Sequence, residues 1–416
     1  MTGLFLLVVS VKLAAPDGGK VVQMPLDDYV AAVLAGESSV FRSDEALKAM
    51  AVAARTYAVR LRGRHSREGY DFCATTHCQR VNPKAVSARL QSIADETSGE
   101  LLWFEGKPAF ACYTRDCGGR SEDVRAVWPE VDAPYLKIHD DPYCLRSGGS
   151  LWEWSASPEQ ILTALRESGL RGPPVLREIA IKQTTTSGRA RVLDLSGVPI
   201  SAGSFQFAIG RVIGWDTLRS SQYRVRGLKF EGSGGGHGVG LCQVGADRMG
   251  TEGHSYREIL DFYYPGTLVG LTGRGLKWTR LGGEFVTVLS TQPDRDAAMV
   301  QKTERFARAL SSRSKLVLPA HIEVRIYPDL DSYRNATGAP GNVAGFTRGS
   351  RIDLQPVRVL GDSFDATLRH ELFHVLVENH VKPGLPVSVR EQMVACLERT
   401  GQETCATRSQ AATKSK

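Results

Sequence analysis

Three groups of residues have side-chain types and spacings that could support chemistry. The most distinctive is LRHELFHVLVENH, in which His370 and His374 stand four residues apart around Glu371. Two imidazoles on one helical face can bind zinc, and the glutamate between them can take a proton from zinc-bound water. The motif therefore predicts a zinc-dependent hydrolytic site in a zincin-like domain. The alternatives are a buried amphipathic helix with incidental histidines and a metal-free fold used for binding.

A second group combines thiols with imidazoles. Cys73, His77 and Cys78 fall close together in CATTHC, and His65 lies a short distance before them. Two thiolates and two imidazoles can satisfy a four-coordinate zinc ion. The spacing is irregular for a zinc finger, and a Cys73–Cys78 disulfide is an open alternative because an exported protein would permit one.

The third group centres on Glu37. A helix is predicted to begin after Pro25, and Tyr29, Val33 and Glu37 recur at four-residue steps along one of its faces. A carboxylate that ends an apolar stripe is expected to be partly desolvated, which raises its pKa and suits it to general acid catalysis. A solvated glutamate near a helix end is the alternative.

Two further segments could line a site. A helix is predicted over about 43–62, where Arg55 interrupts an alanine-rich middle and faces either the site or the wet edge of the helix. The glycine-rich stretch 232–243 follows a predicted strand and leaves His237 and Gln243 prominent. Its glycines allow the backbone to approach a ligand closely, but the dinucleotide-binding fingerprint does not fit.

The elements that must position these groups fall into three zones. Residues 1–150 hold two helices and the Cys/His stretch, 151–275 mix helix, strands and the glycine-rich loop, and 276–416 carry a separate strand-then-helix pattern. The turn-rich segment 270–275 is the predicted joint before the last zone. No internal repeat at a fixed period is visible.

Composition excludes several classes of protein. With 42% hydrophobic and 23% charged residues, the chain is neither collagen, coiled coil nor wholly disordered. The net charge of +7 is modest, and no Lys/Arg run of phosphate-tracking length appears, so no nucleic-acid partner is predicted. No apolar stretch approaches the ~18 residues of a transmembrane span.

The N-terminal apolar run, residues 4–11, lacks a preceding Lys or Arg and is a weak signal peptide. It is better interpreted as a strand that turns at 16–19 and pairs with KVVQM as a hairpin. Eight cysteines are too few for a disulfide scaffold. Their local pairs predict either bridges or metal ligation: Cys73/Cys78, Cys112/Cys117 and Cys396/Cys405.

Taken together, residues 1–275 resemble the SpoIID/LytB family, named for a sporulation protein that remodels peptidoglycan and for an amidase enhancer. The match rests on five segments in the expected order: PLDDYVAAVLAGE (25–37), ALKAMAVAARTYA (46–58), YDFCATTHCQ (70–79), CGGRSE…VW (117–128) and GHGVGLCQVGADRMGTEGHSYREILDFYYPG (236–266).

The resemblance implies a lytic transglycosylase that acts on peptidoglycan glycan strands, with the acidic catalyst falling on Glu37. It also implies a zinc ion held by Cys73, His77 and Cys78, with His65 as a plausible fourth ligand. The expected location is extracytoplasmic: periplasmic, secreted or associated with the cell wall. A different class of function is a noncatalytic glycan-binding enhancer of a cell-wall amidase, which would place Glu37 far from the 236–243 segment.

One departure from the family involves cysteine. Cys242 stands where the family has serine in GHGVGLSQ, so Cys117 and Cys242 are expected near the groove. A disulfide among Cys112, Cys117, Cys144 and Cys242 is possible, and three connectivities stay open.

Residues 285–400 resemble gluzincin-type peptidases of the MA clan. This resemblance implies Glu391 as the third zinc ligand after His370 and His374, although Gln392 stands where those peptidases have glycine. The predicted fold is therefore α+β, with a SpoIID-like mixed domain, a smaller zincin-like α+β domain and a flexible tail over 401–416.

Overall fold

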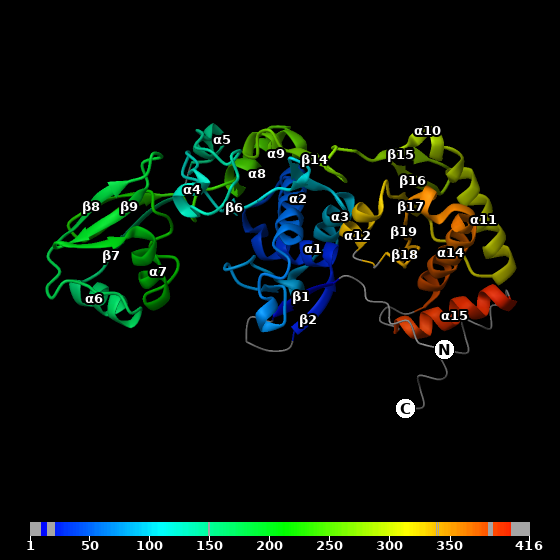
Figure 1. The fold of residues 1–416 in the computed structure, drawn as a ribbon, viewed down its shortest axis with the longest axis horizontal. Helices are drawn as coiled ribbons and strands as arrows, with labels where there is room; N and C mark the ends of the chain where they lie inside the picture. The colour runs from blue at the N-terminus through cyan, green and yellow to red at the C-terminus, as the bar shows by residue number, and fades with distance from the viewer. Residues whose placement is uncertain are drawn as a thin grey trace, which may run out of the picture. The chain divides into compact units, whose positions relative to one another are not determined.

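The computed structural model describes residues 10–14, 21–148, 150–337, 339, 341–381 and 386–400 (Figure 1). The chain is a mixture of helices and several small sheets, which confirms the predicted α+β class. Internal contacts divide it into two compact units. The central unit contains Asp28–Val269, and the C-terminal unit contains Val21–Asp27 and the described residues from Gly270 onward.

The helices of the central unit are α1 (Leu26–Glu37), α2 (Asp44–Arg60), α3 (Ala88–Glu96), α4 (Val124–Val127), α5 (Pro142–Arg146), α6 (Pro158–Glu167), α7 (Ala202–Val212), α8 (Gln243–Thr251) and α9 (Tyr256–Tyr263). Its strands are β3 (Phe72–Cys73), β4 (Leu101–Phe104), β5 (Lys107–Pro108), β6 (Tyr113–Thr114), β7 (Leu151–Ser155), β8 (Ile179–Thr184), β9 (Ala190–Leu195), β10 (Val198–Ser201), β11 (Tyr223–Arg226), β12 (Lys229–Ser233), β13 (Leu241–Cys242) and β14 (Leu268–Gly270).

Helices α1 and α2 form where the apolar spacing predicts them. Ser43 is the N-cap of α2, and its side chain accepts a hydrogen bond from the Ala46 amide, as expected of a serine just before a helix. Tyr29 and Val33 of α1 and Leu47 of α2 are fully buried. Burial of both apolar faces fixes the direction in which α1 delivers its last residue, Glu37.

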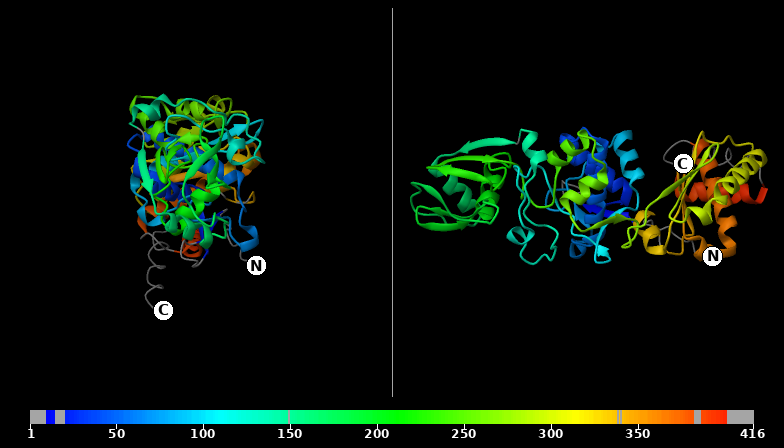
Figure 2. Two further views of the ribbon diagram at one scale, coloured as in Figure 1. Left: turned by 90° about the vertical axis from the view of Figure 1, so that its left-hand side faces the viewer. Right: turned by 90° about the horizontal axis from the view of Figure 1, so that it is seen from above.

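Residues 151–233 form a separate lobe of the central unit, green in Figures 1 and 2. Two three-stranded sheets, with the orders β10-β9-β8 and β11-β12-β7, share an apolar core with α6 and α7. Phe205 and Phe230 are fully buried in that core and stack on each other.

A short parallel pair, β6 with β13, brings two distant segments of the central unit together. Leu241 pairs with Tyr113 and Cys242 with Thr114. Gly240 has φ +76°, and a Cβ at this position would lie 2.0 Å from the carbonyl oxygen of Cys112. The close approach that this glycine permits is therefore to the protein's own backbone rather than to a ligand.

The C-terminal unit contains strands β1 (Ser10–Ala14), β2 (Val21–Pro25), β15 (Thr279–Gly282), β16 (Val286–Ser290), β17 (Ile322–Ile326), β18 (Gly345–Arg348) and β19 (Arg351–Leu354). Its helices are α10 (Pro293–Asp296), α11 (Ala298–Ser314), α12 (Leu330–Thr337), α13 (Val357–Leu360), α14 (Phe364–His380) and α15 (Val387–Thr400).

A five-stranded sheet of order β15-β16-β17-β19-β18 organises this unit. The inner strands β16, β17 and β19 run parallel, and β18 is an antiparallel edge strand. One apolar cluster unites the sheet with helices α11, α14 and α15. The sheet thus supports α14, which carries the HELFH motif, and α15, which carries Glu391.

Parts of the N-terminal and C-terminal predictions fall outside the described residues. β1 and β2 are neighbouring strands, but the predicted turn at 16–19, the apolar run before Ser10, Cys405 and the tail 401–416 are not described. Among the described helices, none combines the length and apolar character needed to cross a membrane.

Candidate functional site

Glu37 is the last residue of α1 and lies against two other segments of the chain. Gln243, the first residue of α8, donates from Nε2 to Oε2 of Glu37 at 3.2 Å. On the other side, Gly36 permits close approach of the 79–81 backbone, because a Cβ there would lie 2.2 Å from the carbonyl oxygen of Arg80. Glu37 is therefore not far from the 236–243 segment, which it contacts through Gln243.

The surroundings of Glu37 favour retention of a proton. Burial raises the pKa of its carboxylate, and the Gln243 hydrogen bond, the charges of Arg80 and Arg115 and a main-chain hydrogen bond from Arg80 lower the pKa by less. Among the described groups with the largest effect on this pKa there is no second carboxylate. The side chain remains partly exposed, so its proton is accessible.

The sequence did not reveal which polar contacts from other segments lie near Glu37. Tyr29 donates to Gln79 Oε1 at 2.8 Å, and Gln79 Nε2 donates to the Tyr113 hydroxyl at 3.1 Å. The charge of Glu37 in turn raises the pKa of Tyr113, after burial. Arg80 and Arg115 are exposed arginines in ordinary loop sequence, and only the fold reveals that they act on Glu37.

His237 is engaged by main-chain groups. The Val239 amide donates to His237 Nδ1 at 3.0 Å, and the ring meets Trp128 edge to face. Desolvation and the charge of Arg189 lower the pKa of His237 to about 4, against a smaller opposing effect of the Tyr113 main chain. The imidazole is therefore neutral at pH 7. The side chain is partly exposed, and its contact with substrate stays a prediction.

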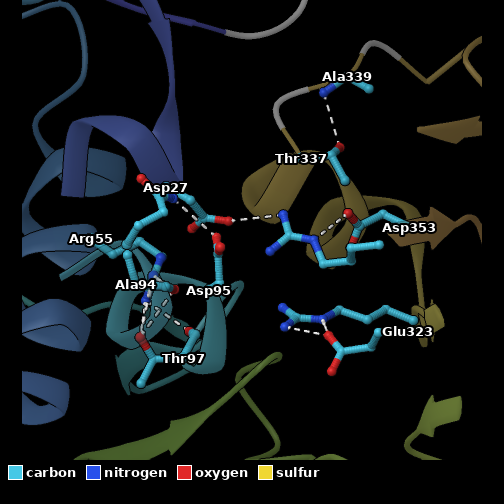
Figure 3. A network of polar contacts seen from close by, with 12 residues as sticks. Asp27, Arg55, Ala94, Asp95, Thr97, Glu323, Thr337, Ala339 and Asp353 are labelled. Atoms are coloured by element: carbon cyan, nitrogen blue, oxygen red, sulfur yellow. Dashed lines mark hydrogen bonds and ion pairs between the residues drawn. The ribbon is translucent and has the colours of Figure 1, made fainter. Parts of the chain in front are cut away.

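Arg55 does not occupy the place that the sequence suggested. It is 0% exposed, and its guanidinium donates to the carbonyl oxygens of Ala94 and Thr97, both at 2.8 Å (Figure 3). These carbonyls end α3, where the last residues lack intrahelical partners. The proposed substrate contact is corrected to a structural role, because a fully buried guanidinium cannot reach a glycan.

The four residues of the Cys/His group lie together in the central unit. Cys78 Sγ is 3.3 Å from His65 Nε2, and the sulfurs of Cys73 and Cys78 are each 3.7 Å from His77 Nδ1. All four ligand atoms lie within 4.8 Å of one another. Ligands about 2.0–2.3 Å from a tetrahedral zinc ion are themselves separated by roughly 3.3–3.8 Å, so this donor set fits zinc.

The disulfide alternatives within the central unit are not formed. Six cysteines are free thiols: Cys73, Cys78, Cys112, Cys117, Cys144 and Cys242. The predictions of a Cys73–Cys78 disulfide, of a Cys112–Cys117 disulfide and of a disulfide among Cys112, Cys117, Cys144 and Cys242 are therefore wrong. Cys396 is disulfide-bonded, whereas Cys405 lies outside the described residues.

The HELFH histidines and Glu391 converge within the C-terminal unit. His370 Nε2 and His374 Nε2 are 3.2 Å apart, and the Glu391 oxygens are 3.9 and 3.4 Å from them. His370 Nδ1 lies 2.9 Å from Glu398 Oε1, which orients the ring as outer carboxylates do at zinc sites. His370 and Glu391 are partly exposed, so three ligands would leave a coordination position open.

Glu371 is buried beside these ligands. Thr347 of β18 donates to Glu371 Oε2 at 2.7 Å, and burial raises the pKa of the carboxyl against the opposing effects of His374 and that hydrogen bond. Gly345 of β18 leaves room for this side chain, since a Cβ there would lie 2.7 Å from Glu371 Cγ. The edge strand therefore packs directly against the motif.

Comparisons with known proteins address the central unit. The family model "Stage II sporulation protein" (SpoIID) matches residues 17–104. An uncharacterised protein of Brachyspira hyodysenteriae is 31% identical over 59% of this chain and 66% of its own length. Stage II sporulation protein D of Bacillus amyloliquefaciens is 28% identical, covering 62% of this chain and 78% of that protein.

The amidase enhancer of Bacillus subtilis is 26% identical over 56% of this chain, which spans only 39% of the enhancer's length. The chain thus covers just under two thirds of the Brachyspira protein and well under half of the enhancer. These findings support the SpoIID family for the matched part of the chain. The matched segment contains both Glu37 and the Cys/His group.

Replacing Arg55 with Met tests its structural role. Removal of the guanidinium takes one strong, charged donor from each of two buried carbonyls at the end of α3, so the free energy of unfolding should fall by about 1–3 kcal/mol. Urea unfolding followed by circular dichroism measures the change. Arg60→Met, an exposed arginine of the same helix that donates to the Pro108 carbonyl, should change stability far less. Equal effects of the two substitutions would contradict the structural role.

Proposed function

We propose that the central unit is a lytic transglycosylase that cleaves peptidoglycan glycan strands, with Glu37 as its general acid and base. The observation that carries the proposal is the environment of the Glu37 carboxyl. Partial burial raises the pKa of this carboxyl, and Gln243 Nε2 donates a hydrogen bond to its Oε2 at 3.2 Å. The similarity to Stage II sporulation protein D and to an amidase enhancer supports a function related to the cell wall. An extracytoplasmic location follows from that substrate.

A single carboxyl suffices for this reaction. Glu37 first gives its proton to the glycosidic oxygen as the C1–O bond breaks. The 6-hydroxyl of the same muramic acid then attacks C1, and its proton returns to Glu37, which restores the acid and leaves a 1,6-anhydro ring. A hydrolase would instead need a second carboxyl roughly 5–9 Å away to serve as nucleophile or to activate water.

The positions of Arg80 and Arg115 fit the second half of this cycle. Both cations favour ionised Glu37, although burial outweighs them in the free protein. Once the proton has gone to the leaving sugar, their charges stabilise the carboxylate until the 6-hydroxyl returns a proton. The raised pKa thus serves the acid step, and the two arginines serve the base step.

We propose that the Cys/His group of His65, Cys73, His77 and Cys78 binds zinc in a structural role. Four protein ligands complete a tetrahedron and leave no position for substrate. The chain continues from Cys78 through Gln79, which donates to Tyr113, to Arg80, which lowers the pKa of Glu37. Zinc would therefore fix the segment that forms one side of the Glu37 environment.

We further propose that the C-terminal unit is a zinc-dependent peptidase. His370, His374 and Glu391 would hold the ion, which lowers the pKa of bound water, and Glu371 would accept the proton of that water. Strand β18, beside α14, is at the edge of the five-stranded sheet, and an extended peptide can add to a sheet edge as a further strand. If the substrates are the peptides of the cell wall, both units of the chain would act on peptidoglycan.

A noncatalytic enhancer of a cell-wall amidase is the competing function. The name of the Bacillus subtilis relative favours it. The contact between Glu37 and Gln243 favours catalysis instead, because an enhancer has no need for a carboxyl of raised pKa beside the glycine-rich segment.

Glu37→Gln preserves the side-chain shape and removes the proton that titrates. Release of anhydro-muropeptides from purified peptidoglycan, measured by mass spectrometry, should fall roughly 10²–10⁴-fold. Glu130→Gln, at an exposed carboxylate, is the matched control and should retain activity. A folded Glu37→Gln protein that still releases these products would exclude the catalytic role. A wild-type protein that releases none of these products but stimulates an added amidase would establish the enhancer function.

Arg115→Gln should move the alkaline limb of the pH profile to higher pH. The general acid must be protonated, so cleavage is lost as pH rises through the pKa of Glu37. Arg115 lowers that pKa, and its removal raises the pKa and extends activity upward. The rate of anhydro-product release across pH measures the shift. Arg125→Gln, an exposed arginine paired with Asp132, should leave the limb in place, and a downward shift for Arg115→Gln would contradict the assignment.

Two substitutions separate metal binding from turnover in the C-terminal unit. Glu371→Gln should leave zinc bound and abolish cleavage of wall peptides, because the base is removed while the ligands remain. His374→Ala should lose both zinc and cleavage. Elemental analysis combined with mass spectrometry of stem peptides provides the two readouts. Full peptide cleavage by Glu371→Gln would contradict the assignment of the base.

A further inference from the structure

A second group of thiols lies in the interior of the central unit. Cys117, Cys144 and Cys242 are at most 1% exposed, and Asp141 is 0% exposed. One ligand atom from each of the four lies within 4.8 Å of the other three. The group is separate from the Cys/His residues, and neither Glu37 catalysis nor the peptidase site uses it.

These four residues arrive from three segments that are distant in sequence. Cys117 follows β6, Asp141 and Cys144 belong to the first turn of α5, and Cys242 ends β13 and is the N-cap of α8. The parallel β6–β13 pair sets the spacing between the first and last segments. Convergence of three soft ligands and a carboxylate is therefore a product of the fold rather than of a local turn.

Hydrogen bonds around the group suit thiolates and an ionised carboxylate. The amides of Cys117 and Gly245 point at Cys242 Sγ, at 3.3 and 3.4 Å. Asp141 accepts from the Tyr263 hydroxyl at 2.8 Å through Oδ2 and from the Cys144 amide at 2.9 Å through Oδ1. Such donors hold metal ligands in position and support their negative charge.

One buried cation lies beside the group, and its hydrogen bond there goes to a main-chain carbonyl rather than to a ligand atom. In the described part of the chain, neither Asp141 nor nearby Asp116 forms an ion pair with Lys or Arg. That buried cation is Arg189, whose Nη2 donates to the Cys117 carbonyl at 2.6 Å and whose charge also acts on Cys242. A buried carboxylate among thiols is costly unless a cation is present.

We propose that Cys117, Cys144, Cys242 and Asp141 form a second zinc site, closed and structural. Four ligands around one tetrahedral ion are separated by about 3.3–3.8 Å, which the 4.8 Å limit accommodates. A polynuclear iron–sulfur cluster spreads its cysteines further apart, because several ions stand between them. A disulfide would use only two of the sulfurs and would not account for the third thiol and Asp141, which complete a set of four ligands.

Binding of zinc replaces two contacts of the free thiols. Cys117 Sγ donates to Asp141 Oδ2 at 3.3 Å, and Cys144 Sγ donates to Asp116 Oδ1 at 3.0 Å. The three thiols lose their protons to solvent as the metal enters. Asp116 keeps the amides of Gly118 and Ser150 as donors, so it remains satisfied as an outer residue.

The site has a consequence for Glu37. Gln243 follows Cys242 directly and donates to Glu37. An ion that ties Cys242 to α5 and to the segment at Cys117 fixes the start of α8 and therefore the position of that amide. The zinc would act by positioning and would not contact substrate.

The experiment uses the full chain with the other two groups disabled by His65→Ala, Cys78→Ser and His374→Ala. This background protein should retain one zinc per chain by elemental analysis, with a predominantly sulfur shell at about 2.3 Å by X-ray absorption. Adding Cys242→Ser should remove that zinc. Adding Cys112→Ser, at a buried cysteine outside the group, should not.

A second measurement covers the case in which the substituted proteins do not fold. In the wild-type chain, a chelator should increase alkylation of Cys117, Cys144 and Cys242 relative to Cys112, as read by peptide mass mapping. The proposal would be overturned if the folded background protein contained no zinc, or contained iron instead. It would also be overturned by a mapped disulfide between two of the three cysteines, or by alkylation that does not depend on the chelator.

Discussion

The arrangement of the central unit depends on keeping one carboxyl, Glu37, partly out of water at the end of a buried helix. Desolvation favours the protonated form, and a hydrogen bond from Gln243 with the charges of two arginines limits that preference. Such a balance requires the contacting segments to be placed to within a fraction of an ångström, because hydrogen bonds weaken steeply with distance and angle. Gly36 shows how tight the packing is, since any side chain there would collide with the backbone of Arg80.

Three groups of potential metal ligands differ in a way that predicts their roles. The Cys/His group and the Cys/Asp group each supply four ligands from within the protein, whereas the HELFH group supplies three and keeps two of them partly exposed. Closed four-ligand sites stabilise a fold, and three-ligand sites leave a position for water or substrate. On this basis, metal ions would stabilise the fold of the central unit, and the Glu37 carboxyl would carry out its chemistry. The C-terminal unit would draw its reactivity from the metal.

The sequence was sufficient for features that depend on local periodicity. The apolar spacing in 26–37 and 44–60 predicted α1 and α2, and the four-residue step between His370 and His374 placed them together. It could not find Arg80 and Arg115, because no local pattern distinguishes an arginine that faces a distant carboxyl. The sequence also gave the wrong position for the Arg55 side chain, because the carbonyls that accept hydrogen bonds from its guanidinium come from the end of another helix, α3. The sequence allowed a disulfide among Cys112, Cys117, Cys144 and Cys242, and only the fold shows that three of these thiols lie together with Asp141 while Cys112 lies outside the group.

The order of residues along the chain explains how the metal groups and the carboxyl would work as one site. Arg80 stands two residues after Cys78, and Gln243 directly follows Cys242. The last ligand of each four-ligand set is therefore close in sequence to a residue that acts on Glu37. A bound ion removes the conformational freedom of its ligands, and the next residue inherits that restriction through the peptide backbone. Metal binding at both groups would thereby restrain the segments that contribute Arg80 and Gln243. This restraint suits a reaction in which the same carboxyl must give a proton and then recover it from a hydroxyl on the same sugar, because both transfers require the carboxyl to stay in place.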